Sequence, residues 1–201
     1  NLRAMGPELA RAAANILPGA RLDAIAYGCT SGTVVMGIEA TCAQIAEGRP
    51  GVPVTTPASA ALAAFDALDV RRLSVLTPYS EEINTAIADF LVAHGCDIRA
   101  FASFDLDTDE AMSGVPQAAI PEAAAAADTP DSDAVFISCT ALRAVGCVAD
   151  LEARLGKPVV TSNQAMFWHA LRLAGIDDAV SGRGKLLQRT LDGTPCRPVA
   201  A

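Results

Sequence analysis

The sequence is poor in aromatic residues, in basic charge and in long apolar stretches. Aromatic residues make up 4% of the 201 positions, and 15 Lys and Arg stand against 23 Asp and Glu, which gives a net charge of −8. Because no basic stripe is present, we expect no nucleic-acid partner. Gly, Pro, Thr or charged residues interrupt the apolar stretches well before the roughly 18 residues of a membrane span, so we also expect no membrane partner.

Motifs for metal and phosphate binding are also missing. No Cys-x-x-Cys pair occurs, and the two histidines, His94 and His169, lack the spacing of zinc ligands. Residues 181–185 resemble a Gly-rich phosphate loop, but no predicted strand precedes them. We therefore expect neither a metal site nor a phosphate loop.

Six cysteines are present, enough for three disulfides: Cys29, Cys42, Cys96, Cys139, Cys147 and Cys196. Secreted disulfide scaffolds are short chains without a large core, whereas this chain is long and 51% hydrophobic. That composition also excludes a low-complexity disordered chain. No charged-then-apolar signal segment opens the sequence, and we expect a cytoplasmic protein.

Short apolar runs alternate with Ala-rich helical segments. Strands are predicted at 22–27, 73–76, 133–138 and 158–161, and more weakly at 52–55 and 98–103. Helices are predicted at 2–17, 33–47, 58–68, 81–94 and 164–173. Continuous apolar runs are typical of parallel strands that are covered on both faces. The alternation predicts an α/β fold with parallel sheets.

The sequence contains an internal repeat of two segments. Residues 23–30 (DAIAYGCT) align with 133–140 (DAVFISCT), and residues 51–56 (GVPVTT) align with 156–161 (GKPVVT). Two matching segments in the same order indicate two similar lobes, related by a pseudo-two-fold axis.

We predict that the first lobe comprises residues 1–69 with about 176–201, and the second residues 70–175. The second lobe begins with its own strand, at 73–76, ahead of its first helix. No strand precedes the first helix of the first lobe. By the logic of the repeat, this lobe lacks its first strand.

Cys29 and Cys139 occupy matching positions of the repeat. Each follows a predicted strand and precedes a predicted helix. Ligands of open α/β sheets bind beyond the carboxyl ends of the strands, and the start of a helix stabilises a thiolate. The pseudo-two-fold axis would place the two thiols face to face across a cleft. One could attack carbon or remove a proton while the other returns a proton from the opposite side.

The residues that follow the two cysteines supply hydrogen-bond donors. Thr30, Ser31 and Thr140 offer backbone N–H groups and hydroxyls that can hold a carboxylate. A single cysteine at a strand end is more often a packing residue, and the other four cysteines are interpreted in that way. The matched pair instead indicates catalysis.

Four segments carry a family resemblance: 27–33 (YGCTSGT), 77–79 (TPY), 138–143 (SCTALR) and 158–163 (PVVTSN). With them the sequence resembles the aspartate/glutamate racemase superfamily. The closer resemblance is to its branch of maleate cis–trans isomerases, arylmalonate decarboxylases and ectoine-utilisation proteins. The resemblance implies two Rossmann-like lobes, no metal, no organic cofactor and a small carboxylate substrate between the cysteines. Enzymes of this class are often dimers or tetramers, so it also implies a homo-oligomer.

The resemblance implies roles for individual residues. The catalytic pair is Cys29 and Cys139, and the substrate-binding residues are Thr30, Ser31, Tyr79 and Thr140. Because decarboxylases of this branch use one cysteine, two cysteines favour a maleate isomerase-like reaction or racemisation of an amino acid or ectoine-derived acid. An arylmalonate-type decarboxylase, a non-catalytic binding protein and a redox protein remain as alternatives.

The sequence departs from the family at two places. The family's first strand carries a Pro-rich turn and a substrate-binding Asn, and no such segment is present. Members often have an Asn in the loop after the strand predicted at 98–103, where Thr108 stands here. Loss of that amide weakens the case for maleate as the substrate.

Overall fold

The computed structural model describes residues 2–191, so Cys196 and the last part of the predicted first lobe lie outside the described residues. In the first part of the chain, the elements are η1 (Leu2–Glu8), α1 (Leu9–Ala14), β1 (Ile25–Ala26), α2 (Thr30–Met36), α3 (Ile38–Gly48), β2 (Val54–Thr55) and α4 (Pro57–Leu68).

The remainder of the described chain contains β3 (Arg72–Tyr79), α5 (Glu81–Ala93), β4 (Asp97–Leu106), α6 (Asp109–Ser113), α7 (Ala119–Ala127), β5 (Ala134–Ile137), η2 (Val145–Cys147), α8 (Val148–Leu155), β6 (Val159–Thr161), α9 (Ser162–Leu173) and η3 (Leu186–Gln188). The predicted α/β fold with parallel sheets is confirmed. One sheet pairs β1 with β2, the other has the strand order β4-β3-β5-β6, and every pairing is parallel.

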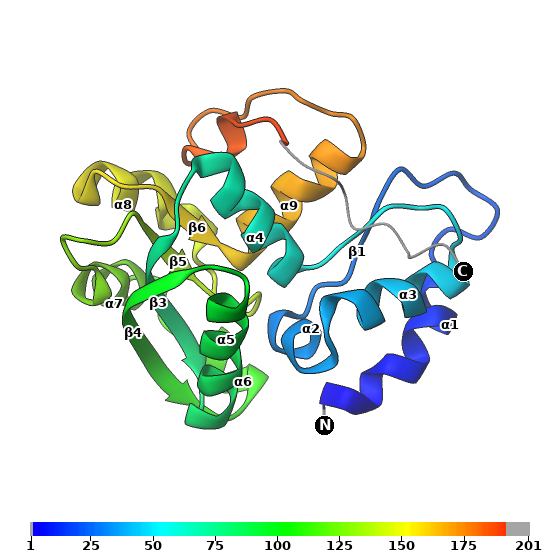
Figure 1. Ribbon diagram of the computed structural model, residues 1–201, viewed down its shortest axis with the longest axis horizontal. Coiled ribbons are helices and arrows are strands. Elements are labelled where there is room, and N and C mark those ends of the chain that lie inside the picture. Colours follow the sequence, from blue (N-terminus) through cyan, green and yellow to red (C-terminus); the bar gives the residue numbers. More distant parts are fainter. Residues whose placement is uncertain (1, 192–201) are drawn as a thin grey trace.

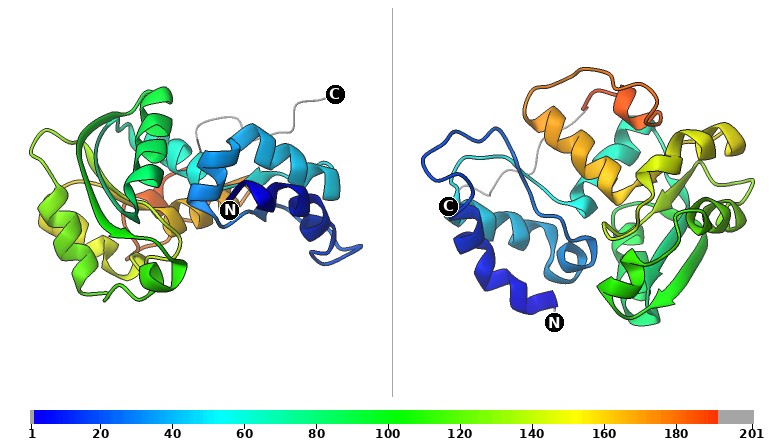
Figure 2. Two further views of the ribbon diagram at one scale, coloured as in Figure 1. Left: turned by 90° about the horizontal axis from the view of Figure 1, so that it is seen from below. Right: turned by 180° about the vertical axis from the view of Figure 1, so that it is seen from behind.

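Helices α1, α2 and α3 lie to one side of the larger sheet. Helices α4 and α9 lie between these three helices and the larger sheet (Figures 1 and 2). None of the described helices is long and apolar enough to cross a membrane.

Some predicted boundaries were wrong. The helix predicted at 33–47 is two helices, because Gly37 has a φ of 92° and ends α2. The helix predicted at 2–17 is the 3-10 segment η1, which contains Pro7, followed by the short α1. No ranges were predicted for α6, α7 and α8, which have only 5, 9 and 8 residues.

The two copies of the internal repeat pair their strands in the same register. In the first sheet, Ile25 pairs with Val54 and Ala26 with Thr55. The aligned residues of the second sheet pair in the same register: Val135 with Val159 and Phe136 with Val160. The two aligned segments therefore form the same parallel strand pair twice.

The helices that follow these strand pairs are also alike. Helices α4 and α9 have 12 residues each, and each is capped by a threonine of the repeat. The Thr56 hydroxyl accepts the N–H of Ser59 at 3.1 Å, and the Thr161 hydroxyl accepts the N–H of Gln164 at 3.1 Å. Such caps satisfy backbone donors at a helix start and stabilise it by about 1 kcal/mol each.

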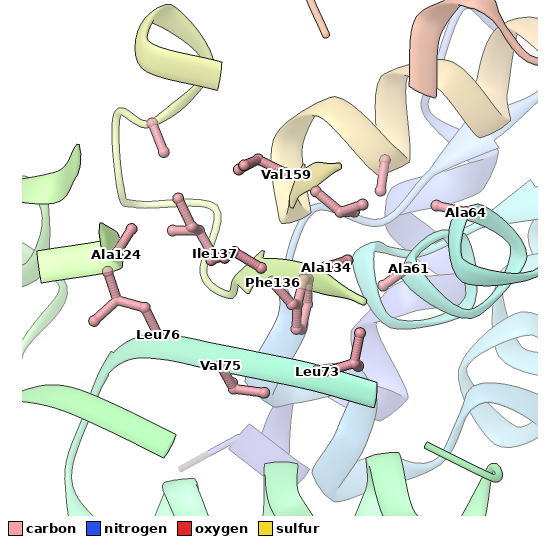
Figure 3. Close-up of a cluster of buried hydrophobic side chains, with 14 of the residues drawn as sticks. Ala61, Ala64, Leu73, Val75, Leu76, Ala124, Ala134, Phe136, Ile137 and Val159 are labelled. Carbon is pink, nitrogen blue, oxygen red and sulfur yellow. The ribbon is translucent and has the colours of Figure 1, made fainter. Parts of the chain in front are cut away.

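The main hydrophobic core surrounds the larger sheet. Ala134 and Phe136 of β5 lie near Ala61 of α4, and the ring of Phe136 meets Phe65 edge-on at 5.3 Å (Figure 3). Burial of a side chain of this size stabilises the fold by roughly 1.5–3 kcal/mol. Side chains of α4 and η3, which the sequence assigned to the first lobe, thus join the core of the larger sheet. This shared core holds the ends of the two sheets close together.

Candidate active site

A cleft of about 550 Å³ opens where β1, β3 and β5 end. Its lining contains all six residues that the sequence predicted for the site: Cys29, Thr30, Ser31, Tyr79, Cys139 and Thr140. The structure therefore brings these residues together from both halves of the repeat. The lining also contains residues that the sequence analysis gave no role: Met5, Gly28, Asp109, Glu110, Ser113 and Ala141.

Cys29 is a free thiol at the start of α2. Its sulfur accepts the backbone N–H of Gly32 at 3.3 Å, and the Ser31 hydroxyl lies 3.8 Å from it. A Cβ atom at position 32 would lie 2.9 Å from this sulfur, so only glycine leaves room for the contact. The Cys29 sulfur therefore lies against a backbone donor at a helix start.

Cys139 is a free thiol, only 6% exposed. Burial raises the pKa of this thiol, although the Tyr79 hydroxyl and the N–H groups of Ala141 and Leu142 act in the opposite direction. The Ala141 N–H lies 3.3 Å from the sulfur. At neutral pH, Cys139 therefore holds its proton.

The backbone of Cys139 is strained, with a φ of 109°. A non-glycine residue in such a region costs about 1–3 kcal/mol and is found mostly at functional sites. The predicted helix directly after Cys139 is absent, which corrects the expectation that a helix dipole acts on both thiols. The Ser162 hydroxyl accepts the Cys139 N–H, and the Asn163 amide donates to the carbonyls of Thr140 and Leu142. The Asn163 amide thus engages two carbonyls that would accept hydrogen bonds within a helix that begins after Cys139.

Tyr79 ends β3 beside Cys139 and is 4% exposed. Burial strongly raises the pKa of its hydroxyl, and the neighbouring Cys139 adds to this effect. The Tyr79 carbonyl accepts hydrogen bonds from the Ser103 hydroxyl at 2.6 Å and the Asn84 amide at 2.7 Å, which fixes this end of the strand. Tyr79 is therefore a protonated donor at a defined place in the cleft.

A second tyrosine, which the sequence analysis did not select, stands beside the other thiol. Burial, with Cys29 as a further cause, raises the pKa of Tyr27 to about 12. A Cβ atom on Gly32 would lie 2.7 Å from the Tyr27 hydroxyl, so this hydroxyl and the Cys29 sulfur flank the same glycine. The sequence signal was the position of Tyr27 directly after β1 and two residues before Cys29.

Thr30 and Thr140 connect the two halves of the site through their hydroxyls. Thr30 donates to the Ser162 hydroxyl at 3.1 Å, and Thr140 donates to the Gly28 carbonyl at 2.9 Å. Each bond joins one cysteine loop to the opposite half of the repeat. The two threonine hydroxyls thus fix the two cysteine loops relative to each other.

Two carboxylates, Asp109 and Glu110, stand at the edge of the cleft. They begin α6, which Thr108 caps by accepting the Ala111 N–H at 3.2 Å. Asp109 is near enough to Cys139 for its charge to contribute to the raised pKa of that thiol. Among the described residues that line the cleft, none is Lys, Arg or His.

Neither His94 nor His169 lines the cleft. The His169 ring is buried against the Thr55 hydroxyl at 2.7 Å, and burial lowers its pKa to about 4. His94 lies 2.7 Å from the Phe90 carbonyl at the end of α5. Within the described part of the chain, no three His, Cys, Asp or Glu residues are grouped so that they could hold a metal ion.

The sequence profile of the arylmalonate decarboxylase family matches residues 10–187. The chain belongs to this family. An arylmalonate decarboxylase of Bordetella bronchiseptica is 37% identical over 127 residues, which cover 62% of this chain and 53% of that enzyme. A maleate isomerase of Pseudomonas putida is 27% identical over 194 residues, which cover 92% of this chain and 77% of that enzyme. The chain thus spans about half of the decarboxylase and about three quarters of the isomerase.

Solved structures of the same family agree with the fold. A maleate isomerase of Nocardia farcinica, a cysteine variant with a covalently bound succinylcysteine intermediate, superimposes with a TM-score of 0.85 at 26% identity, over 93% of this chain and 79% of that one. Unliganded arylmalonate decarboxylase superimposes with a TM-score of 0.76 at 30% identity, over 92% of this chain and 81% of that one. The sequence resemblance to this branch is confirmed, and its named members are isomerases and a decarboxylase.

Proposed function

We propose that the chain is a cofactor-independent isomerase that uses Cys29 and Cys139 on a small carboxylate, in the manner of a maleate cis–trans isomerase. The observation that carries this proposal is the placement of two free thiols in one cleft, at matching positions of the repeat. A single-thiol reaction such as decarboxylation needs only one of them. The relatives named as maleate isomerases support the same reaction class.

The two thiols have different roles in the proposed reaction. Cys29, with the Gly32 N–H on its sulfur, is the nucleophile, and its thiolate adds to an alkene carbon. The alkene electrons move to the neighbouring carbon and its carboxylate, and Cys139 delivers its proton to that carbon. The resulting single bond rotates. Cys139 then takes a proton back, the carbon–sulfur bond to Cys29 breaks, and both cysteines return to their starting states.

The carboxylate is held by donors in the cleft lining. The hydroxyls of Ser31 and Tyr79 donate to its oxygens. Thr30 and Thr140 act through their backbone N–H groups, because their hydroxyl protons are engaged with Ser162 and Gly28. These donors also stabilise the negative charge that develops on the carboxylate during addition.

Racemisation of an amino acid is the second candidate, and one observation favours it. Asp109 and Glu110 line the cleft, whereas no cationic side chain does so among the described lining residues. Carboxylates attract an ammonium group and repel a second carboxylate. In this reaction the same two thiols exchange the proton of the carbon next to the carboxylate.

Proton NMR in D₂O, with maleate, aspartate, glutamate, ectoine-derived acids and an arylmalonate, separates these reactions. Conversion of maleate to fumarate supports the isomerase. Deuterium at a retained α-carbon, with loss of optical purity, supports the racemase. For variants of Cys29 and Cys139, the matched control is Cys147→Ser, because the Cys147 thiol donates to the Ala144 carbonyl and does not line the cleft.

Three other results would overturn the proposal. Loss of carbon dioxide from the arylmalonate by a Cys29→Ser variant would indicate a decarboxylase. A reversible disulfide between Cys29 and Cys139 would indicate a redox protein. No turnover, with iodoacetamide labelling of Cys29 no faster than that of Cys96 and Cys147, would indicate a binding protein.

A further inference from the structure

Ser162 is a buried residue that contacts the loops of both cysteines. It begins α9, and its side chain is 0% exposed. Its hydroxyl oxygen accepts the Cys139 N–H at 3.0 Å and the Thr30 hydroxyl at 3.1 Å. Thr30 directly follows Cys29 but lies 132 positions from Ser162 in the sequence. One oxygen atom therefore links the two thiol-bearing segments.

The Cys139 end of this link needs an external partner. With a φ of 109°, the Cys139 backbone is outside the regions that favour an L-residue, and no helix follows to hold it. Ser162 binds its N–H, and the neighbouring Asn163 donates to the Thr140 carbonyl at 2.9 Å. The start of α9 thus determines the direction in which the Cys139 thiol leaves the strand.

The aligned residue of the first lobe cannot do the same. The repeat aligns Ser162 with Pro57, which has neither a hydroxyl nor an N–H. Cys29 instead donates its own N–H to the Tyr27 carbonyl at 3.1 Å, within the same loop. Of these two aligned positions, only Ser162 therefore supplies a hydroxyl that links the two cysteine loops.

We propose that Ser162 is a positioning residue that sets the placement of the Cys139 thiol relative to Cys29. This inference rests on the proposed two-thiol function. Ser162 is not among the residues that line the cleft, so it acts through Cys139 and Thr30 rather than on the substrate. A small change in the separation of two groups that act on one substrate lowers turnover more than it lowers binding.

The test is Ser162→Ala, with Ser59→Ala as the matched control. Ser59 lies in the first turn of the equivalent helix α4, where its hydroxyl accepts the Thr56 N–H at 3.0 Å, away from the cleft. We expect kcat of Ser162→Ala to fall about 10-fold or more while KM changes less than about 3-fold. A kcat within twofold of the control would overturn the proposal.

Labelling of the substrate-free protein gives a readout that needs no turnover. Loss of the Ser162 bond should raise the iodoacetamide rate of Cys139 at least threefold, with Cys29 changed less, as measured by peptide mass spectrometry. This result supports the positioning role even where no substrate is turned over, so it separates failure of this inference from failure of the proposed function. Unchanged labelling of Cys139 would overturn it.

Thr30→Val is the second variant, and it serves where Ser162→Ala does not fold. It removes the donor to Ser162 and leaves the Ser162 bond to Cys139. We expect kcat to fall and Cys139 labelling to rise. In the double variant, the losses should be less than additive, because both changes break one link. Full additivity, or wild-type labelling in Thr30→Val, would contradict the link.

Discussion

Cys29 and Cys139 come from aligned segments of the repeat, yet the chain holds them differently. Cys29 has an extended backbone and caps α2, whose Gly32 N–H contacts its sulfur. Cys139 has a φ of 109°, is buried, and has a raised pKa because of that burial. One loop places a backbone donor on a half-buried thiol, and the other buries its thiol and disfavours loss of the proton. Repetition of a segment therefore reproduces the position of a group without reproducing its surroundings.

The largest effect should come from removal of either thiol. Cys29→Ser and Cys139→Ser should each lower kcat by about 10³-fold or more, because a serine hydroxyl is far less acidic than a thiol. The double variant should lose little more than the worse single variant, since the two groups act as a unit. Steady-state kinetics on the substrate found by NMR measure this. Full activity in either single variant would end the two-thiol assignment.

The next effect concerns the glycine that makes room for Cys29. A Cβ atom on Gly32 would lie 2.7 Å from the Tyr27 hydroxyl and 2.9 Å from the Cys29 sulfur. Gly32→Ala should therefore displace the thiol and lower kcat/KM by roughly 10- to 100-fold. Gly146→Ala is the control, because a Cβ atom there meets nothing within 4 Å. Equal kinetics of the two variants would show that the Gly32 contact is dispensable.

The pH dependence of labelling sharpens the comparison further. Because burial raises the pKa of Cys139, its thiolate forms only at a pH above the ordinary thiol value of about 8.5. Its alkylation rate should be half-maximal at a higher pH than that of a small free thiol such as glutathione. Because burial disfavours the Cys139 thiolate, the free energy of unfolding is highest below the unfolded-state pKa of this thiol and decreases as pH rises through the folded-state value. A half-maximal rate at or below the small thiol's pH would contradict the proton-retaining role.

The smallest expected effect is on stability. It compares Asp23 and Asp133, the acidic residues that begin the two aligned segments of the repeat. Asp133 is 25% exposed and accepts the N–H of Arg72 at 2.9 Å, and the Arg72 guanidinium lowers its pKa to about 2. Asp23 pairs with the exposed Arg21 at 2.9 Å. Asp133→Asn should lower the free energy of unfolding at pH 7 by about 1 kcal/mol, and Asp23→Asn by less than about 0.5 kcal/mol.

Urea unfolding at several pH values measures this difference. The lowered pKa means that Asp133 contributes stability above its unfolded-state value of about 3.9, and that the contribution is lost as pH falls toward 2. The Asp133→Asn variant should therefore approach the parent in stability at low pH. A constant difference from pH 7 to pH 2 would show that the Asp133 charge is not the cause.

Much of the local structure could be predicted because it depends on nearby residues. The apolar run 134–137 forms a buried strand, and the aligned segments pair in one register. Tyr79 and Cys139 reach one cleft because β3 and β5 are neighbouring parallel strands that end at the same edge of the larger sheet. Cys29 follows β1 of the smaller sheet, and the internal repeat predicted that it would face Cys139. The helix expected after Cys139 was wrong, since the side chains that displace it come from another element, α9.

By itself, the sequence determined the parallel α/β pattern, the internal repeat and the paired cysteines, since each follows from short-range pattern. Only the tertiary structure decided the burial of Cys139, the placement of Asp109 and Glu110, and the link from Ser162 to Thr30 across 132 positions. Burial and charge proximity depend on which surfaces meet when the chain closes, and no local pattern records that.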